Sequence, residues 1–560
     1  MHSLNVTSIT CVFDQAIYCK ALEIKSKNVD IYKQVVLRLG TFHTLCTLLS
    51  IIGKRFQDAG LKDLCIESGI VAEGSVSALL EGRSYNRAIR VHKLAYEALM
   101  RVAWRGFQPW VDERYPIDMD HIRRALDEVA NLGNDLTKDN HDRVIESQPF
   151  KCLNERFEEY VDHLRKTNGP LSAFWMSYIK MVELTLHMVR ASREGDWTLH
   201  LSCIRQMLPW CFAYDAINYA RYMSVYYSDM TSLQEEHPEV HEFMKTGGFT
   251  VQMSSKNTFG RIPVDQTVEE TVNKDTQTAG GTKGFSLKSS AVQRYYITAE
   301  FRSLFLRNLR TMVGYAQGNN DHVDIEQSRI AKDEQDVKAM VDHIESNWTN
   351  PFSSYQPLLS ISTGATASPE IERDLSRAYL VGETAYQQFK KERLEPEKPP
   401  GKFHHTLKKQ KLKTFSDHNK TKKVKQSKGN ETVLRADRNL FARMIIIAES
   451  RQLQMQEVLC HPLGPLPASL ATSNGLPRKT NTAQLGRELE KLVQPTVVVP
   501  TPSAYLIDVM SLIQKLKVDH LTFGEIAEMA LSRVLREGEG SSRIYVALCL
   551  TCIGTCQLNQ

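Results

Sequence analysis

Apolar residues recur at steps of three and four through much of the chain, and this periodicity constrains the fold more than any other feature. In the stretch "TFHTLCTLLSIIGKRF", one helical face carries Phe42, Leu45, Leu49, Ile52 and Phe56. The stretch "SYNRAIRVHKLAYEALMRVAW" repeats the pattern, and a long helical block is expected from about residue 150 to about residue 245. Aromatic and Met residues at the same spacing favour a packed helical core over a cofactor site. We therefore expect a mainly α protein.

The amino end departs from this helical pattern. Two short β-branched stretches, "SITCVF" and "QVVLRLG", flank the helical text "DQAIYCKALEI" and predict a small α/β unit. Further along, Gly69, Gly74 and Gly82 are expected to end helices, and Ser75 is expected to cap the next one. Polar text at 131–149 predicts a surface connection.

The length and the changes in composition predict several domains. A chain of 560 residues exceeds what one hydrophobic core usually supports. The text from "PEKPPG" onward is rich in proline and then lysine, and burial cannot offset the chain entropy of such a segment. The predicted segments are an α/β to helical unit at 1–130, a helical block at 150–315, a helical unit at 316–395, a Pro/Lys-rich linker or arm at 396–431, a helical segment at 432–494 and a truncated α/β fragment at 503–560.

Positive charge is concentrated in one segment. The net charge is only +5, yet ten lysines oppose Asp417 alone between Lys402 and Lys428, which leaves the rest of the chain mildly acidic. Lysine runs attract phosphate without reading bases, so the segment predicts contact with nucleic acid or with a nuclear-import receptor. A solvated linker without a ligand is the alternative. The expected binding residues are Lys408, Lys409, Lys411, Lys413, Lys420, Lys422, Lys423 and Lys425.

Cysteine usage and the chain ends indicate the compartment. The eleven cysteines show no paired framework, which indicates buried thiols in a reducing environment. Cys549, Cys552 and Cys556 lack the fourth ligand that a structural zinc site requires. No signal peptide is visible, and the closing run at 544–560 is too short and too polar to cross a bilayer. We expect a nuclear or cytoplasmic protein that is neither secreted nor a membrane protein.

The stretch "VDQTVEETVNKDTQTAGGTKGF" is the first candidate for metal chemistry. Asp265 and Glu269 are i,i+4 neighbours, and Glu270 lies within the same two turns. Hard divalent cations prefer such oxygen ligands. Acidic residues also favour the positive end of a helix, and in that interpretation Gly280 and Gly281 only end the element. The spacing of "GGTKG" is not that of a phosphate loop.

The second acidic candidate is Asp508, at the end of the short apolar strand predicted in "AYLIDVMSLIQKLK". A carboxylate at this position holds metal in α/β nucleases, although a lone Asp also caps helices. Two-metal chemistry needs several convergent carboxylates, so we predict no complete catalytic site. If the protein is an enzyme, Mg²⁺ or Mn²⁺ is the expected cofactor at Asp265, Glu269, Glu270 or Asp508. His43 and His92 are expected to be core or partly exposed residues.

Several stretches, including "VFDQAIYCKALEI", "LRLGTFHTLCTLLSIIGKRFQDAGLKDL" and "VDQTVEETVNKDTQTAGGTKGF", resemble a mobile-element-associated protein family multiplied in aquatic animal genomes. The resemblance covers nearly the whole chain and implies a transposon-derived origin, but supplies no biochemical activity. Residues 1–330 distantly resemble RNase H-like transposases, and residues 503–548 resemble the start of a PIN or flap-endonuclease-like domain. Gly40 stands where the transposase pattern implies an Asp, which argues against an intact catalytic triad.

These observations favour a transposon-derived, nuclear, multidomain protein that contacts nucleic acid non-specifically and has no complete catalytic site. The alternatives are a metal-dependent nuclease or RNase H-like transposase, and a protein-binding scaffold.

Overall fold

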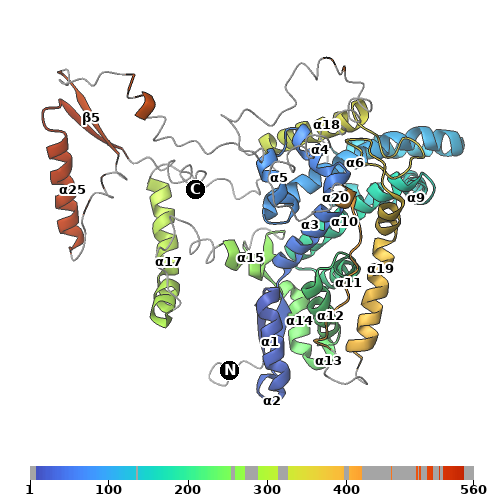
Figure 1. Ribbon diagram of the computed structural model, residues 1–560, viewed down its shortest axis with the longest axis horizontal. Coiled ribbons are helices and arrows are strands. Elements are labelled where there is room, and N and C mark those ends of the chain that lie inside the picture. Colours follow the sequence, from blue (N-terminus) through green and yellow to red (C-terminus); the bar gives the residue numbers. More distant parts are fainter. Residues whose placement is uncertain are drawn as a thin grey trace, which may run out of the picture. The chain divides into compact units, whose positions relative to one another are not determined.

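The protein is described by a computed structural model, and its residues are mainly helical, which confirms the predicted fold class. The chain divides into two compact units, Met1–Thr271 with Glu300–Leu463, and Val272–Ala299 with Gly464–Gln560 (Figure 1). The structure describes residues 8–133, 137–253, 259–270, 288–312, 326–395, 403–418, 501–508 and 521–547, together with residues 454, 456, 487–489, 491–492, 512 and 516.

Unit 1 begins with a β-α-β arrangement. Strand β1 (Ile9–Phe13) pairs in parallel with β2 (Val35–Leu39), and each residue of β1 faces one residue of β2. Parallel strands need a crossover, here formed by α1 (Gln15–Lys27) and α2 (Val29–Tyr32). The side chain of Asp14 caps α1 by accepting a backbone N–H at 2.8 Å. Both predicted strands and the helix between them are confirmed.

A series of helices follows β2 and forms the body of unit 1. The predicted helical block appears as several helices joined by short connections. In chain order the elements are α3 (Thr41–Phe56), η2 (Gln57–Ala59), α4 (Leu61–Glu67), α5 (Glu73–Leu80), α6 (Tyr85–Arg114), η3 (Pro116–Asp118), α7 (Met119–Leu132), α8 (Lys138–Glu146), α9 (Gln148–Lys166), α10 (Pro170–Glu194), α11 (Trp197–Ala213), α12 (Ile217–Thr231), α13 (Leu233–Glu236), α14 (Pro238–Phe243) and η4 (Met244–Gly248).

Some helix boundaries differ from those predicted. Gly69 and Gly82 have φ of 71° and 75° and follow the ends of helices, as expected. Gly74 and Ser75 instead lie inside α5, so neither ends or caps a helix there. The polar connection at 131–149 contains α8, because the hydroxyl of Thr137 accepts a backbone N–H and starts a helix.

The later elements of the chain complete the described structure. Strands β3 (Thr250–Gln252) and β4 (Arg261–Pro263) form an antiparallel pair, and β4 leads directly into the short helix α15. The further helices described up to residue 418 are α15 (Val264–Val268), α17 (Ser289–Met312), α18 (Gln327–Ser346), α19 (Pro369–Arg393) and α20 (Phe415–His418).

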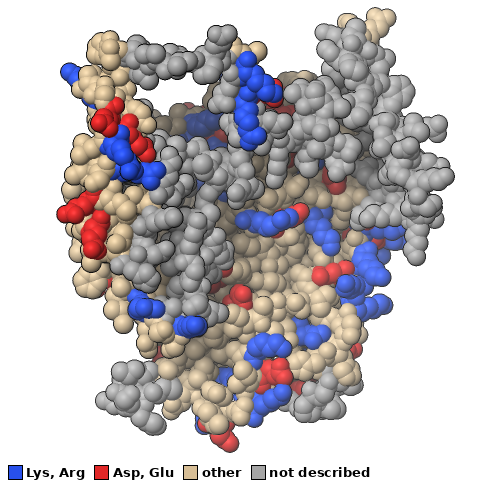
Figure 2. All heavy atoms as spheres, turned by 60° about the vertical axis from the view of Figure 1, so that its left-hand side comes forward, with Lys and Arg blue, Asp and Glu red and all other residues tan. Residues whose placement is uncertain are grey.

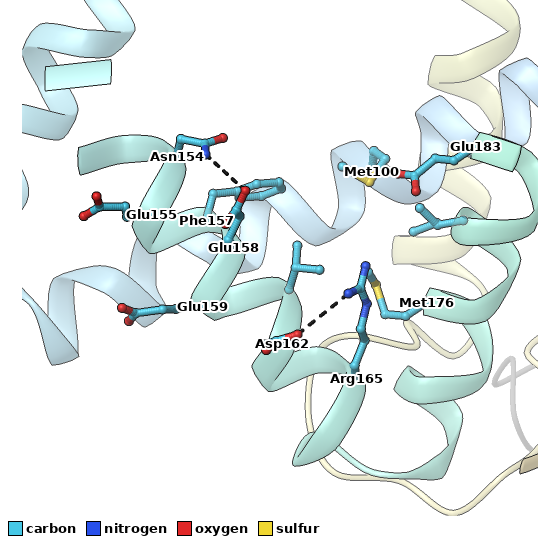
Figure 3. A pocket seen from close by; sticks show the side chains of 12 residues that line it. Met100, Asn154, Glu155, Phe157, Glu158, Glu159, Asp162, Arg165, Met176 and Glu183 are labelled. Carbon is cyan, nitrogen blue, oxygen red and sulfur yellow. Dashed lines mark hydrogen bonds and ion pairs between the residues drawn. The ribbon is translucent and has the colours of Figure 1, made fainter. Parts of the chain in front are cut away.

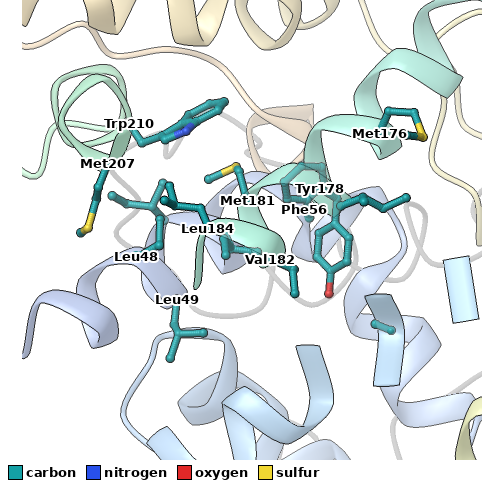
Figure 4. Close-up of a cluster of buried hydrophobic side chains, with 14 of the residues drawn as sticks. Leu48, Leu49, Phe56, Met176, Tyr178, Met181, Val182, Leu184, Met207 and Trp210 are labelled. Atoms are coloured by element: carbon teal, nitrogen blue, oxygen red, sulfur yellow. The ribbon is translucent and has the colours of Figure 1, made fainter. Parts of the chain in front are cut away.

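The core of unit 1 lies where α3, α10, α11 and α19 pack together. Figure 4 shows Leu48 of α3, Val182 of α10 and Met207 of α11 among its buried side chains. Helix α19 approaches α11 closely at Gly382, which has no side chain. A β-carbon at this position would lie 1.9 Å from the carbonyl oxygen of Pro209, so the close approach requires a glycine. The aromatic and Met residues of the helical block are therefore core residues, as predicted.

Charged residues are spread over the surface of the protein. Figure 2 shows Lys and Arg side chains interspersed with Asp and Glu on the face that it draws. Many are paired: Arg90 of α6 lies 2.5 Å from Asp336 of α18, and Arg101 of α6 lies 2.6 Å from Glu334. Among the described residues, no helix combines the length and the apolar content needed to span a membrane.

Unit 2 contains a second β-α-β arrangement. Strand β5 (Ala504–Asp508) pairs in parallel with β6 (Arg543–Ala547), and α25 (Phe523–Glu537) lies between them in the chain. Thr522 and Glu525 form a capping box at the start of α25. The strand predicted in "AYLIDVMSLIQKLK" is confirmed as β5. The helical segment predicted at 432–494 lies outside the described residues except at a few positions, and the candidate thiols Cys549, Cys552 and Cys556 lie outside them.

Candidate functional site

The acidic residue Asp265 of α15 caps a helix that lies far from it in the sequence. Its side chain is buried, and one carboxylate oxygen accepts the backbone N–H of Phe42 at 3.1 Å. The other oxygen accepts the backbone N–H of His43, also at 3.1 Å. These donors belong to the first turn of α3, whose own N-cap residue is a glycine without a capping side chain. Asp265 therefore supplies the capping oxygens and a negative charge at the positive end of α3.

Gly40, the N-cap of α3, is required by this arrangement. A β-carbon at this position would lie 2.3 Å from the Oδ2 atom of Asp265. The backbone N–H of Gly40 donates to the carbonyl oxygen of Phe13 at 2.7 Å, which ties the ends of the two parallel strands together. The carboxylate of Asp265 thus occupies the space that a side chain at position 40 would enter.

His43 lies between two carboxylates. Its Nδ1 atom is 3.1 Å from Oδ2 of Asp265, and its Nε2 atom is 3.3 Å from Oε1 of Glu269. The hydrogen bond that the ring of His43 donates to Asp265 raises the pKa of His43, and this effect outweighs the lowering by partial burial. The charges of Asp265, Glu269 and Asp14 raise the pKa further. When the imidazole ring of His43 is protonated, both of its nitrogens are hydrogen-bond donors. We call His43, Asp265 and Glu269 the His43 cluster.

Cys46 lies one turn after His43 but is not an active nucleophile. Burial, followed by the negative charges of Asp265 and Glu269, raises the pKa of its thiol to about 12. The thiol therefore stays protonated at neutral pH. Within the described part of the chain, no three His, Cys, Asp or Glu side chains are placed to hold a metal ion. The His43 cluster can hold and release a proton, and Glu269 is its more exposed carboxylate.

The predicted acidic residues are only partly brought together. Asp265 and Glu269 share one face and meet at His43, as their spacing implied. Glu270 is exposed and accepts a hydrogen bond from the side chain of Gln266 at 2.8 Å. Asp508 is the last residue of β5, in unit 2, where it faces Ala547. The expected helix stop at 280–281 lies outside the described residues.

The two histidines singled out by the sequence have different environments. His92 is buried, its Nδ1 atom lies 2.8 Å from the hydroxyl of Tyr178, and burial lowers its pKa to about 4. It is a core residue, as expected. His43 is partly exposed, as expected, but sequence reasoning missed its two carboxylate partners. The only signal was its place three residues after the strand-ending "LRLG".

Residues 403–418, which we call the strap, lie against the helices of unit 1. The backbone N–H groups of Gln410 and Lys411 donate to the two carboxylate oxygens of Asp215 at 2.7 and 3.0 Å. The backbone N–H of Lys413 donates to Asp374 at 3.0 Å. Carboxylates of the helical body thus bind the backbone of this segment, where a linker or arm was expected over 396–431.

Apolar residues fix both ends of the strap. Phe403 packs against Tyr222 of α12 with a ring separation of 5.9 Å, and the buried Phe415 packs against Phe174 of α10 at 6.3 Å. Near Phe403, the guanidinium of Arg221 donates to two strap carbonyl oxygens. These contacts offset the entropy of ordering the segment.

The backbone contacts leave several strap lysines turned to solvent. Lys408, Lys409 and Lys411 are exposed, and the structure pairs none of these three ammonium groups with a described carboxylate. Lys413 differs because its ammonium group forms an ion pair with Glu370. The remaining predicted lysines, Lys420, Lys422, Lys423 and Lys425, lie outside the described residues.

A groove of about 710 Å³ between α9 and α10 contains further acids (Figure 3). Most of these carboxylates have partners within the protein. Glu158 accepts from Asn154 at 3.2 Å, Asp162 lies 2.8 Å from the ammonium of Lys166, and Glu183 accepts from a tyrosine hydroxyl. The groove is formed by other elements than those of the His43 cluster, and its acids stabilise local structure.

Comparisons with known proteins give one match. A family model described as a domain of unknown function, DUF8702, matches residues 1–461, which is more than half of the chain. The match includes the His43 cluster and the strap. Neither the curated proteins nor the solved structures returned a match.

Proposed function

The chain belongs to the DUF8702 family, and we propose that it is a transposon-derived nuclear protein that binds the phosphate backbone of nucleic acid through its lysine-rich segment. In this proposal it has no complete catalytic site. The observation that carries the proposal is the strap, whose backbone is held by carboxylates, while three of its lysine side chains are exposed and have no carboxylate partner within the described ranges.

The chemistry of the strap supports contact with phosphate and not with bases. Exposed ammonium groups release counterions from nucleic acid when they bind phosphate, and they carry no sequence information. Because the backbone of the strap is held in place, less chain entropy is lost on binding than for a free segment. The further lysines between 420 and 428 in the sequence would add to the same charge.

The test compares two triple variants of the full chain in binding to a duplex DNA. The first replaces Lys408, Lys409 and Lys411 with Gln. The matched control replaces Lys20, Lys138 and Lys151, which are exposed lysines on α1, α8 and α9. Fluorescence anisotropy between about 50 and 200 mM salt gives the affinity and its dependence on salt.

We expect the strap variant to bind more weakly and the control to bind like the unaltered protein. Each lost phosphate contact lowers the slope of log affinity against log salt by about 0.9, so three contacts give a change of roughly 2 to 3. Equal slopes for the two variants, or binding that salt does not weaken, would contradict the proposal. If the protein binds no nucleic acid, the protein-binding scaffold or an import-receptor segment becomes the better interpretation.

A metal-dependent nuclease or RNase H-like transposase is the second candidate. The observation that favours it is the position of the acids around His43: Asp14 follows β1, and α15 brings Asp265 and Glu269 to the end of β2. Ligands of open α/β sheets bind at the carboxyl ends of parallel strands. Because Asp265 already accepts N–H groups with both oxygens, Glu269 is the acid to test.

The experiment for this candidate measures nuclease activity of the full chain in Mg²⁺ or Mn²⁺. Activity that Glu269→Gln abolishes, while Glu270→Gln on the neighbouring residue retains it, would support the enzyme. Glu270 is a suitable control because it is exposed and does not contact His43. Absence of activity, or equal effects of the two substitutions, would exclude a metal reaction at the His43 cluster.

A further inference from the structure

A small pocket lies where α12 packs against α1 (Figure 1). Its volume is about 200 Å³, and all of its lining residues belong to unit 1. The apolar residues that line it are Leu22, Val29, Val36, Leu37, Met230 and Leu233. Because most of these side chains are buried, the walls of the pocket suit an aliphatic group. We call this the Asp229 pocket, after the acid described next.

Asp229 of α12 places a carboxylate in the wall of the pocket. Its side chain is partly buried, and within the described ranges no hydrogen bond or ion pair joins its oxygens to another group. Burial raises the pKa of Asp229 to about 6, against the lowering by the charge of Lys25. A carboxylate that loses water without gaining a partner costs free energy, and such a group in a cavity indicates a binding site.

A second polar group close to Asp229 also lacks a partner. Tyr18 of α1 is fully buried, and its ring lies 6.5 Å from the ring of Tyr226, which precedes Asp229 by one turn of α12. The Tyr18 hydroxyl has no hydrogen-bond partner in the described part of the chain. After burial, the charge of Asp229 is the largest cause that raises the pKa of Tyr18, so the two groups are near each other. Two neighbouring side chains thus keep hydrogen-bonding capacity that the protein does not use.

The charges that line the pocket favour a cation. Glu236 also lines it, and its charge adds to the effect of burial on the pKa of Asp229, so added positive charge would stabilise both acids. Lys25 supplies one ammonium group, but it forms no ion pair with either acid among the described residues. Burial and then the charge of Lys25 lower the pKa of His237 below its ordinary value, so this ring is neutral near pH 7. Two carboxylates therefore face one ammonium group.

We propose that the Asp229 pocket binds an alkylammonium group, with Asp229 as its counter-ion and the apolar walls around its aliphatic stem. A hard metal ion fits less well, because Mg²⁺ and Ca²⁺ need about six oxygen ligands and most of this lining is apolar. Alkylammonium groups occur in free amines and in lysine side chains, and both present the same chemistry to the pocket. This inference goes beyond the proposed contact with nucleic acid and does not depend on it.

The test measures binding of n-butylamine to the full chain by ligand-detected NMR titration. Butan-1-ol has the same stem without the charge and is the matched control ligand. Nα-acetyl-lysine methylamide forms a second arm, since it presents the ammonium group as a protein would. Asp229→Asn removes the charge at nearly constant shape. Glu235→Gln is the control variant, because Glu235 is an exposed acid beside Glu236 that does not line the pocket.

We expect butylamine to bind with a dissociation constant of about one millimolar, as suits so small a ligand, and butanol to bind at least about ten-fold more weakly. Asp229→Asn should weaken the binding of butylamine by about ten-fold, and Glu235→Gln should leave it unchanged. Binding of the lysine derivative as well as butylamine would support the proposal with a lysine side chain as the ligand, and binding of butylamine alone would support it with a free amine.

Three results would overturn the proposal: no binding of either amine, equal binding of butylamine and butanol, or equal affinity of the Asp229→Asn and Glu235→Gln variants for butylamine. The comparison of the two ligands uses the unaltered protein, so it holds even if a variant fails to fold. The affinity for butylamine should also fall between roughly pH 7.5 and pH 5, because Asp229 takes up a proton while the amine stays charged. Protonation of His237 acts in the same direction. An affinity that rises over this range would contradict the role of Asp229.

Discussion

Asp265 and Gly40 share one space at the start of α3, and this predicts a coupled pair of substitutions. Gly40→Asp alone should destabilise unit 1 by about 1 to 3 kcal/mol, because its side chain would overlap the carboxylate of Asp265. Asp265→Ala alone should cost about 1 to 2 kcal/mol, because it leaves N–H groups of α3 uncapped.

The two substitutions together should cost less than the sum of the single effects. With Asp265 shortened to Ala, an Asp at position 40 has room and can cap α3 as an ordinary N-cap residue. Urea unfolding of the four proteins gives the coupling free energy, which we expect to be about 1 kcal/mol or more. Additive effects would show that the carboxylate does not act as the cap of α3.

The raised pKa of His43 predicts how stability depends on pH. A histidine whose pKa is raised by folding contributes stability below its ordinary pKa of 6.5, and this contribution is lost as pH rises through the raised value. His43→Gln should therefore lower the free energy of unfolding at pH 5.5 by up to about 1 kcal/mol, and by less at pH 9. Urea unfolding across this range measures the difference. A difference that grows with pH would contradict the ion pairs of the His43 cluster.

The sequence predicted part of this cluster. The i,i+4 spacing placed Asp265 and Glu269 on one face, and the structure confirms that both contact one side chain. Spacing along one helix gives no information about the residue that this face meets. His43 lies more than two hundred residues earlier, so the contact depends on tertiary packing and could not be read from local pattern.

At the scale of elements, we expect the side chain of Asp215 to hold the backbone of the strap in place. Asp215 has φ of 59°, in the left-handed region that Asn also tolerates. Asp215→Asn should keep this backbone conformation while it removes one of the two acceptor oxygens. We expect weaker protection of the amides of Gln410 and Lys411 in hydrogen exchange, by about 1 to 3 kcal/mol. Asp139→Asn, at an exposed acid of α8, is the control. Equal protection in both variants would contradict this role.

The strap also shows that the amino-acid composition of a segment does not decide whether it packs against the rest of the protein. Its lysine content predicted a segment without enough apolar area to fold. Phe403, Leu407 and Phe415 are few, but each lies against a site on the helical body, and their burial adds to the backbone hydrogen bonds. An average over the segment does not reveal such anchors, because their effect depends on the surface that receives them.

At the scale of the whole molecule, local patterns predicted the element types but not their neighbours. The strands β1, β2 and β5 were readable because β-branched, aromatic and other apolar residues are concentrated in short runs. The packing of α19 on α11 could not be predicted from local patterns, although both helices form the core of unit 1. It depends on Gly382, one of many glycines in the sequence, which lacks the β-carbon that would meet Pro209.

The division into two units predicts separate unfolding, because each unit has its own β-α-β arrangement and its own buried residues. Phe56 is fully buried among aromatic rings in unit 1, and Phe56→Ala should destabilise that unit by about 3 to 5 kcal/mol. Ile507 of β5 is buried in unit 2, and Ile507→Ala should destabilise only unit 2. Calorimetry of both variants should show a lower midpoint for one transition each, and a different transition in each variant. If either substitution lowered both midpoints equally, the two units would form a single cooperative structure.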